Sequence, residues 1–248
     1  MKARIIPYGF SFILYEPRML PKVFNIVKIE ALKPILVGGG TWASLWRVMY
    51  YTRKFRYITQ DLLRQIKGID DRVTSVPKLR ILCDEGYFRE SSNEVFTATN
   101  ETMKVLQRVG CQTRYLPPLT EGEGKINALN NTRVFVQAIK LPNYYEILFE
   151  GFGYIEPDAL LIEKFDNKYK LTFLEIEEPK SDWVNTLEKK RDNYLKLASD
   201  LAFYDFWETA SKILGLRVPT KQELKFNVTF VCSLTRKFGK GFNFKEQL

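Results

Sequence analysis

Two β-prone runs separated by a short polar segment constrain the fold of this chain more than any other stretch. Residues 159–162 and 171–176 consist mostly of apolar side chains, and Asp166 and Asn167 lie between them. Asp and Asn tolerate the positive φ of tight turns, so the pattern predicts a β-hairpin with these two residues as its loop.

The register set by this loop brings acidic side chains together on one face of the hairpin. Asp158 lies directly opposite Glu175, and the Cβ atoms of such a pair are about 4.5 to 5.5 Å apart. The period of two adds Glu156 and Glu177 to this face. Opposed like charges destabilise a sheet, and a hard divalent cation, Mg²⁺ or Mn²⁺, would turn this repulsion into coordination. The alternative is an exposed face whose carboxylates lie in water and pair in part with neighbouring lysines.

The same residues carry a resemblance to a known superfamily. An acidic residue after Pro157, then Glu-x-Glu on the next strand, then a helix, resembles the PD-(D/E)xK restriction-endonuclease-like proteins. The resemblance implies that Asp158 and Glu175 bind Mg²⁺ or Mn²⁺ and that the chain hydrolyses phosphodiester bonds. The third position of the motif, usually Lys, is Glu177 here, as in restriction enzymes with Glu-x-Glu, and this residue would orient the water.

Two further positions follow from this resemblance. An upstream glutamate often completes the metal site, and the predicted strand at residues 144–149 offers Glu146, our expected third ligand, with Glu150 as the alternative. In the helix predicted after the hairpin, Lys190 and Tyr194 resemble the Lys-x-x-x-Tyr of the helix that borders these active sites. Lys190 would offset charge on the phosphate, whereas for Tyr194 we favour a place in the core beside the lysine stem.

The composition excludes several chemistries. The chain has no histidine, which excludes Ser-His-Asp and Cys-His catalysis and His-ligated zinc. Its cysteines, Cys83, Cys111 and Cys232, are odd in number and far apart, which predicts reduced thiols in a cytoplasmic protein. No run of about 18 apolar residues is present, so we expect no membrane span.

The N-terminal half carries most of the excess positive charge. The 248 residues include 38 Lys+Arg and 29 Asp+Glu, a formal net charge of +9, and the excess lies mainly in residues 1–110. This asymmetry favours contact with a polyanion, although ordinary solubility charge is a serious alternative.

The order of predicted elements in this half is typical of a winged helix-turn-helix. The segments are a helix from Thr41, a helix over 60–67 capped by Thr59, a helix that starts at Thr74 or Ser75 and ends at Gly86, β-prone runs at 87–89 and 95–97, and a helix over 100–109. We expect duplex DNA binding with contacts from Arg72, Lys78, Arg80 and Arg89. The alternatives are a small helical domain with solvated basic residues and a winged helix used for protein contacts.

Three stretches resemble the winged-helix half of the replication-relaxation proteins of plasmids and phages: Arg56-Tyr-Ile-Thr-Gln-Asp-Leu-Leu, Lys78-Leu-Arg-Ile-Leu-Cys-Asp-Glu-Gly86-Tyr-Phe and Val95-Phe-Thr-Ala-Thr-Asn-Glu-Thr-Met. A PD-(D/E)xK-like domain follows in that family, and the combined resemblance covers about residues 41–240.

The remaining segments complete the expected order. Gly38-Gly39-Gly40 predicts a hinge or a tight turn, and a phosphate-binding loop is rejected because no Gly-Lys-Ser/Thr follows. A linker is expected at 111–124, a helix at about 125–139 and a strand at 224–232.

Together these patterns predict an α/β chain, α+β overall, in which a winged helix-turn-helix precedes a restriction-endonuclease-like mixed sheet flanked by helices. The expected parts are an unassigned arm at 1–40, a DNA-binding domain at 41–115 and a nuclease-like domain at 116–248. We expect a metal-dependent deoxyribonuclease for replication, mobilisation or repair of a mobile element, and a homodimer is compatible with this. The alternatives are a non-catalytic winged-helix replication or transcription factor with a degenerate nuclease fold, and a protein–protein module.

Overall fold

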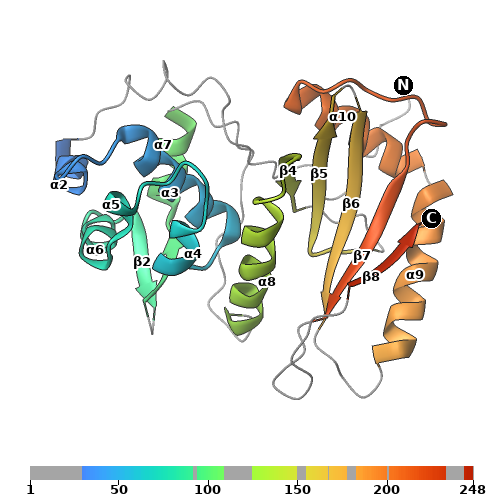
Figure 1. Ribbon diagram of the computed structural model, residues 1–248, viewed down its shortest axis with the longest axis horizontal. Coiled ribbons are helices and arrows are strands. Elements are labelled where there is room, and N and C mark those ends of the chain that lie inside the picture. The colour runs from blue at the N-terminus through green and yellow to red at the C-terminus, as the bar shows by residue number, and fades with distance from the viewer. Residues whose placement is uncertain are drawn as a thin grey trace, which may run out of the picture. The chain divides into compact units, whose positions relative to one another are not determined.

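The structure is a computed structural model with mixed α+β architecture and two sheets (Figure 1). It describes residues 30–91, 94–108, 125–149, 155–166, 168–177, 183–199, 201–232 and 243–247. The chain divides into two compact units, and the boundary between them lies between Leu141 and Pro142.

The N-terminal unit combines short helices with a small antiparallel sheet. In chain order its elements are η1 (Glu30–Leu32), α2 (Lys33–Leu36), α3 (Trp42–Phe55), β1 (Ile58–Thr59), α4 (Gln60–Arg64), α5 (Asp71–Thr74), α6 (Val76–Asp84), β2 (Phe88–Ser91), β3 (Val95–Ala98), α7 (Asn100–Arg108) and α8 (Lys125–Ala138). The sheet has the order β1-β3-β2. Helix α3 is central, since it contacts α2, α5, α7, α8 and β3.

Polar side chains at the helix starts explain where these helices begin. The Thr41 hydroxyl accepts a hydrogen bond from the Ser44 N–H, and the Thr59 hydroxyl accepts one from the Leu62 N–H. Both caps satisfy backbone donors that have no partner within the helix. The predicted starts of α3 and α4 are therefore confirmed, whereas α4 ends at Arg64 instead of residue 67.

The turn at Gly38 to Gly40 exists because the backbone passes close to α5. Gly38 and Gly39 have φ values of +88° and +97°, which favour glycine. A Cβ on Gly39 would collide with the guanidinium of Arg72, and one on Gly40 would collide with Val73. This confirms the expected tight turn.

Helix α8 belongs to the N-terminal unit, which corrects the predicted boundary at residue 115. The Thr132 hydroxyl, which is fully buried, lies 3.2 Å from the carbonyl oxygen of Phe55 and 2.9 Å from that of Tyr57. The rings of Phe55 and Phe135 are 5.8 Å apart. The sequence could not assign α8 because an apolar helix face fits either neighbour, and these contacts decide it.

The C-terminal unit is a five-stranded mixed sheet with two helices. Its elements are β4 (Tyr144–Leu148), β5 (Ala159–Phe165), β6 (Lys168–Glu177), α9 (Trp183–Ser199), α10 (Leu201–Leu214), β7 (Phe226–Cys232) and β8 (Asn243–Gln247). The order is β4-β5-β6-β7-β8, and all pairs are antiparallel except β6 and β7. The parallel pair needs a crossover, which α9 and α10 supply.

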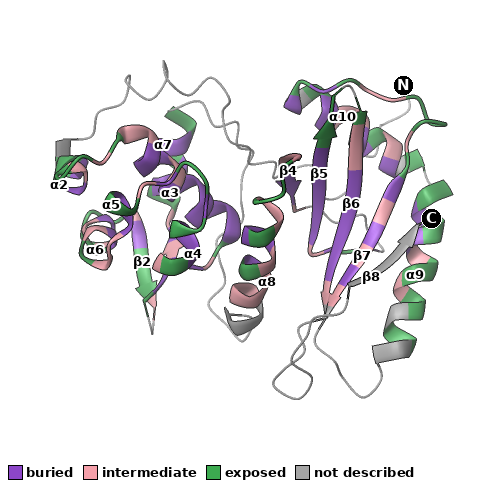
Figure 2. Ribbon diagram, in the orientation of Figure 1, coloured by how far each residue is buried: buried purple, intermediate pink, exposed green. Residues whose placement is uncertain are grey.

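The predicted hairpin is confirmed together with its register. Phe165 pairs with Lys168, and the ladder continues to Ala159 opposite Leu174. Asp166 in the loop has a φ of +49°, the conformation for which an Asp was expected. Figure 2 shows that β5 and β6 are buried along most of their length, so both faces of the hairpin are covered and a slip of one residue would disrupt the packing on each of them.

Both helices pack on the sheet face that carries Phe173. The Phe173 ring lies 5.2 Å from Tyr194 of α9 and 5.4 Å from Phe203 of α10. Phe226 at the start of β7 contacts all three rings. This aromatic cluster fixes α9 over the end of the hairpin.

Two guanidinium nitrogens of Arg53 in the N-terminal unit are buried without a hydrogen-bond partner among the described residues. Arg53, in the last turn of α3, is 4% exposed, and its Nε and Nη2 atoms have no hydrogen-bond partner among the residues that the structure describes. Burial, and next the charge of Arg56, lower its pKa. A buried donor without a partner costs about 1 to 3 kcal/mol.

We therefore expect Arg53→Met to raise the free energy of unfolding by about 1 to 3 kcal/mol, measured by urea denaturation. The matched control is Arg64→Met, because Arg64 is exposed on α4 of the same unit, and substitutions of exposed residues usually change stability by less than about 0.5 kcal/mol. A loss of stability in Arg53→Met would show that its guanidinium has a favourable partner.

Candidate functional site

The candidate site lies where β5 begins and β6 ends. Asp158 immediately precedes β5, one step beyond the pair of Ala159 and Leu174, so the register places it opposite Glu175. Its Oδ2 accepts a hydrogen bond of 2.6 Å from the backbone N–H of Ile176. This bond ties the Asp158 carboxylate to the end of β6.

Glu175 is the centre of the site. Its side chain is almost completely buried, with the residue 1% exposed. Lys190 Nζ lies 2.6 Å from Oε2, and the Tyr194 hydroxyl donates a hydrogen bond of 2.6 Å to Oε1. Lys190 and Tyr194 are four residues apart on α9, so they share one helix face and reach the same carboxylate.

Burial dominates the electrostatics of this cluster. Burial raises the pKa of Glu175. The hydrogen bond and charge of Lys190 and the hydrogen bond of the Tyr194 hydroxyl lower this pKa, and the charge of Asp158 raises it. The net shift of the Glu175 pKa is upward. Burial and then the negative charge of Glu175 raise the pKa of Tyr194, so its hydroxyl keeps its proton and remains a donor. The Lys190 side chain is 31% exposed, so its ammonium also reaches solvent.

The other predicted carboxylates are not gathered here. Glu146 lies opposite Ile162, four positions along β5 from Asp158, or about 13 Å at 3.3 Å per residue. Its carboxylate accepts hydrogen bonds from the Tyr144 hydroxyl and the Ile147 N–H. The structure therefore does not bring our expected third ligand to Asp158 and Glu175.

Two more acidic positions flank the site. Glu156 is exposed, and Glu177 is the last residue of β6, with a side chain outside the described residues. Glu163 lies on the opposite face of the hairpin, where Lys170 forms an ion pair of 2.8 Å with it. Among the residues that the structure describes, no group of three or more Asp, Glu or Cys side chains is arranged to hold a metal ion.

Two carboxylates are nevertheless a suitable donor set for one class of metal site. Mg²⁺ at phosphate-processing sites commonly takes one or two carboxylates and completes its shell with substrate phosphate and water. A carboxylate offers about four lone-pair positions, and Glu175 uses two of them for Lys190 and Tyr194. Asp158 and Glu175 therefore fit Mg²⁺ or Mn²⁺ bound together with a phosphate.

The basic residues predicted to contact DNA have partners within the chain. Arg72 pairs with Asp70, and Lys78 Nζ donates to the carbonyl oxygens of Val37 and Arg72 at 2.7 and 2.5 Å. These two residues fix the Gly38 to Gly40 turn against α5 and α6.

The remaining two lie nearer the β2–β3 hairpin. Arg80 of α6 holds Glu90 of β2 through two hydrogen bonds of 2.9 and 3.0 Å, and its side chain is 53% exposed. Arg89 is exposed on β2.

Sequence reasoning missed Tyr194 as a donor to the site. The residue is a core residue, as expected, because it is fully buried against Phe173 and Phe226. It also binds Glu175, and the signal was its spacing of four residues from Lys190.

Comparisons of the chain with protein-family models, with curated proteins and with solved structures found no match. Within the described ranges, none of the helices combines the length and apolar character needed to cross a bilayer.

The raised pKa of Glu175 gives a pH dependence with a definite sign. The folded state takes up the Glu175 proton at a higher pH than the unfolded chain does. At a pH above the folded-state pKa the ionised carboxylate therefore lowers the free energy of unfolding. This penalty disappears at a pH below the ordinary pKa of a glutamate carboxyl. Glu175→Gln does not titrate. We expect the melting temperature of the wild type, relative to this variant, to fall as pH rises from about 4 to about 7.

Glu223→Gln is the control of opposite sign. Hydrogen bonds from the Thr220 N–H and hydroxyl, and then from Arg217, lower the pKa of Glu223. The wild type should therefore gain stability relative to this variant over the same rise in pH. Equal slopes for the two variants would contradict the assignment of Glu175.

Tyr194→Phe should cost about 1 to 3 kcal/mol of unfolding free energy, because it keeps the ring contacts and leaves Oε1 of a buried carboxylate without its donor. A double-mutant cycle with Glu175→Met, which has no oxygen to accept the bond, followed by urea denaturation, isolates it. A cost that is unchanged in the Glu175→Met background would show that the hydroxyl acts elsewhere.

Proposed function

We propose that this protein is a DNA-binding, metal-dependent phosphodiesterase, with a restriction-endonuclease-like C-terminal unit and a winged-helix N-terminal unit. The observation that carries the proposal is the buried carboxylate of Glu175, which binds Lys190, beside an Asp158 carboxylate that is tied to the next residue of β6, Ile176. Support also comes from the mixed sheet, in which three antiparallel strands are followed by two helices and a parallel strand.

The residues of the site divide the work of hydrolysis. A divalent ion held by Asp158 and Glu175 would polarise the phosphate and lower the pKa of a water ligand. The Tyr194 hydroxyl and the Lys190 ammonium fix the orientation of the Glu175 carboxylate. Lys190 is partly exposed, so the same ammonium can turn to a phosphate oxygen and offset its charge.

Lys190 also addresses the departure at Glu177. A lysine at position 177 would extend from β6, whereas Lys190 extends from α9 to the same carboxylate. In our proposal Lys190 supplies the cation and Glu177 orients the attacking water.

For the N-terminal unit, the order of α3, α4, α6 and the β2–β3 hairpin supports a winged helix that binds duplex DNA. The ion pair of Arg80 with Glu90 is exposed, and such pairs are worth about 0 to 1 kcal/mol, so a phosphate can compete for Arg80. Arg89 lies beside Glu90 on the same hairpin. We assign the role to replication, mobilisation or repair of a mobile element on the resemblance to replication-relaxation proteins.

A second candidate is a DNA-binding replication or transcription factor without catalysis. Two observations favour it: position 177 is Glu, and both oxygens of Glu175 have partners in the chain. The two candidates differ in metal binding and turnover.

Millimolar Mn²⁺ should raise the melting temperature of the wild type, because a ligand at 100 times its Kd adds about 2.7 kcal/mol to stability. Asp158→Asn and Glu175→Gln should remove most of this rise. Glu163→Gln is the matched control, since Glu163 lies on the same hairpin but on the other face, and it should keep the rise.

The same proteins should be incubated with supercoiled plasmid, branched DNA and single strands in Mg²⁺ or Mn²⁺. We expect cleavage by the wild type and by Glu163→Gln, and a loss of about 100-fold or more in the variants of Asp158 and Glu175. Lys190→Met should lose cleavage but keep the Mn²⁺ response. If Mn²⁺ leaves the melting temperature unchanged and no DNA is cut, the non-catalytic candidate replaces the enzyme.

A further inference from the structure

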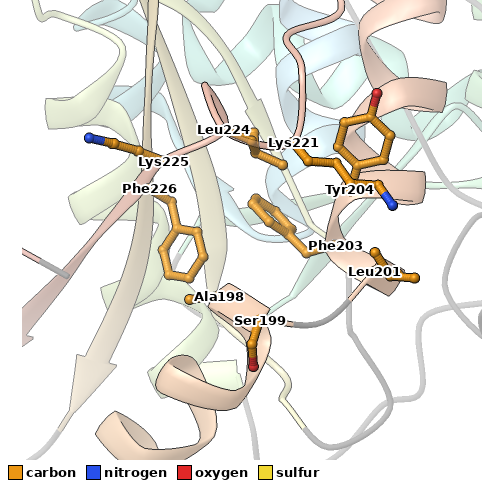
Figure 3. A pocket seen from close by; sticks show the side chains of 9 residues that line it. All are labelled: Ala198, Ser199, Leu201, Phe203, Tyr204, Lys221, Leu224, Lys225 and Phe226. Carbon is orange, nitrogen blue, oxygen red and sulfur yellow. The ribbon is translucent and has the colours of Figure 1, made fainter.

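A cavity of about 260 Å³ lies in the C-terminal unit, at a distance from the carboxylates (Figure 3). It is lined by the end of α9, the start of α10 and the chain that leads into β7. Phe226 in its wall pairs with Leu171, and Glu175 lies four positions further along β6, about 13 Å away.

The cavity has an aromatic and aliphatic floor. Phe203 and Phe226 pack edge to face with ring centres 5.1 Å apart, and both are buried. Leu201, at 56% exposed, and the partly buried Tyr204 extend this apolar surface to the solvent. Large apolar side chains open to solvent beside a hollow are typical of a binding site.

Two lysines give the mouth of the cavity a positive charge. Lys221 Nζ lies 5.4 Å from the centre of the Tyr204 ring, and Lys225 is exposed. In Figure 3 the two side chains extend to opposite sides of the apolar residues. No carboxylate is among the lining residues within the described part of the chain, so the positive charge is available to an anionic ligand.

We propose that this cavity binds one nucleotide of a single-stranded nucleic acid. A base enters the apolar hollow and stacks on the partly exposed ring of Tyr204, above the buried Phe203 and Phe226, while Lys221 and Lys225 hold the phosphates on either side of it. The volume lies below the roughly 300 to 1,000 Å³ of sites for drug-sized ligands, which suits a single planar base.

The cavity selects for stacking and charge more than for base identity. Ser199, the hydroxyl at its edge, donates to the Lys196 carbonyl oxygen, and the described lining contains no Asn, Gln, Asp or Glu to read a base edge. Every base offers a π face, so binding is tolerant of sequence. The inference deepens the proposed function, on which it rests for the choice of nucleic acid, by placing a single strand about 13 Å from the carboxylate site.

The test measures binding of the full chain to fluorescently labelled oligothymidylate and oligoadenylate by anisotropy, in EDTA so that no metal-dependent cleavage occurs. We expect Tyr204→Ala to weaken binding about 10-fold or more for both oligonucleotides. The double variant Lys221→Gln/Lys225→Gln should bind more weakly than the wild type, and the difference should grow as the salt concentration is lowered. The slope of log K against log salt concentration should shrink in magnitude by about 1.4, which is about 0.7 for each of two phosphate contacts.

Lys212→Gln is the matched control, because Lys212 lies on α10 and forms an exposed ion pair with Glu208, and it should bind as the wild type does. Thermal melting checks that each variant is folded; if Tyr204→Ala is unfolded, the double lysine variant decides. Three outcomes would each overturn the inference. The cavity variants could bind like the wild type, the wild type could bind no single strand, or free nucleotide could displace neither oligonucleotide.

The outcome is separate from that of the proposed function. If the wild type cuts DNA while the cavity variants bind single strands normally, the inference fails and the enzyme remains. If the cavity variants lose binding while no protein cuts DNA, the enzyme fails and the nucleotide site remains. Preferential binding of an acidic peptide with an apolar side chain, with no binding of oligonucleotide, would assign the cavity to a protein partner instead.

Discussion

The buried carboxylate of Glu175 is the interaction on which the arrangement of the C-terminal unit depends. Removing an ionised group from water costs several kcal/mol unless hydrogen bonds and opposite charge compensate it. Lys190 and Tyr194 compensate part of this cost, and both come from α9, so the carboxylate joins the end of the hairpin to the helix that covers it. Replacing such a cluster by apolar residues is often neutral or stabilising. Stability alone therefore does not account for it, and this is why we look to function.

The N-terminal unit uses its positive charge in a different way. Lys78 donates hydrogen bonds to two backbone carbonyl oxygens, and Arg72 lies against a glycine turn. Moving Lys78 would take its hydrogen bonds from those carbonyl oxygens, and moving Arg72 would expose the turn. Arg80 and Arg89 lie on exposed surface, where exchange of an ion pair for a phosphate costs little. Any DNA contact of this unit should therefore depend on the second pair more than on the first. A net positive charge on a segment does not by itself say which cations are available.

Much of the fold was predictable because local rules set it. The Asp166 turn and the period of two were sufficient to pair Ala159 with Leu174, the last pair before Asp158 and Glu175, and threonine caps located the starts of two helices. The boundary of the units was not predictable, since the Thr132 hydroxyl and its helix could have packed on either side. The short α5 was missed because four residues are too few to show a helical period. The spacing of Tyr194 from Lys190 indicated a shared helix face, but it did not show that the hydroxyl would bind Glu175 as well as the ring fill the core.

The identity of the partner of Lys190 illustrates what sequence patterns leave open. The strand period places positions 175 and 177 on one face, and α9 packs over that face through Phe173 and Tyr194. Lys190 lies one turn before Tyr194 on α9, so it reaches the carboxylate of Glu175 from the helix. A lysine at position 177 would instead extend from the strand. A search for the motif by spacing along the strand registers only the glutamate at 177. Under the proposed function, the charge at the third position of the motif has to be judged from the packing of α9, because Lys190 of this helix faces Glu175.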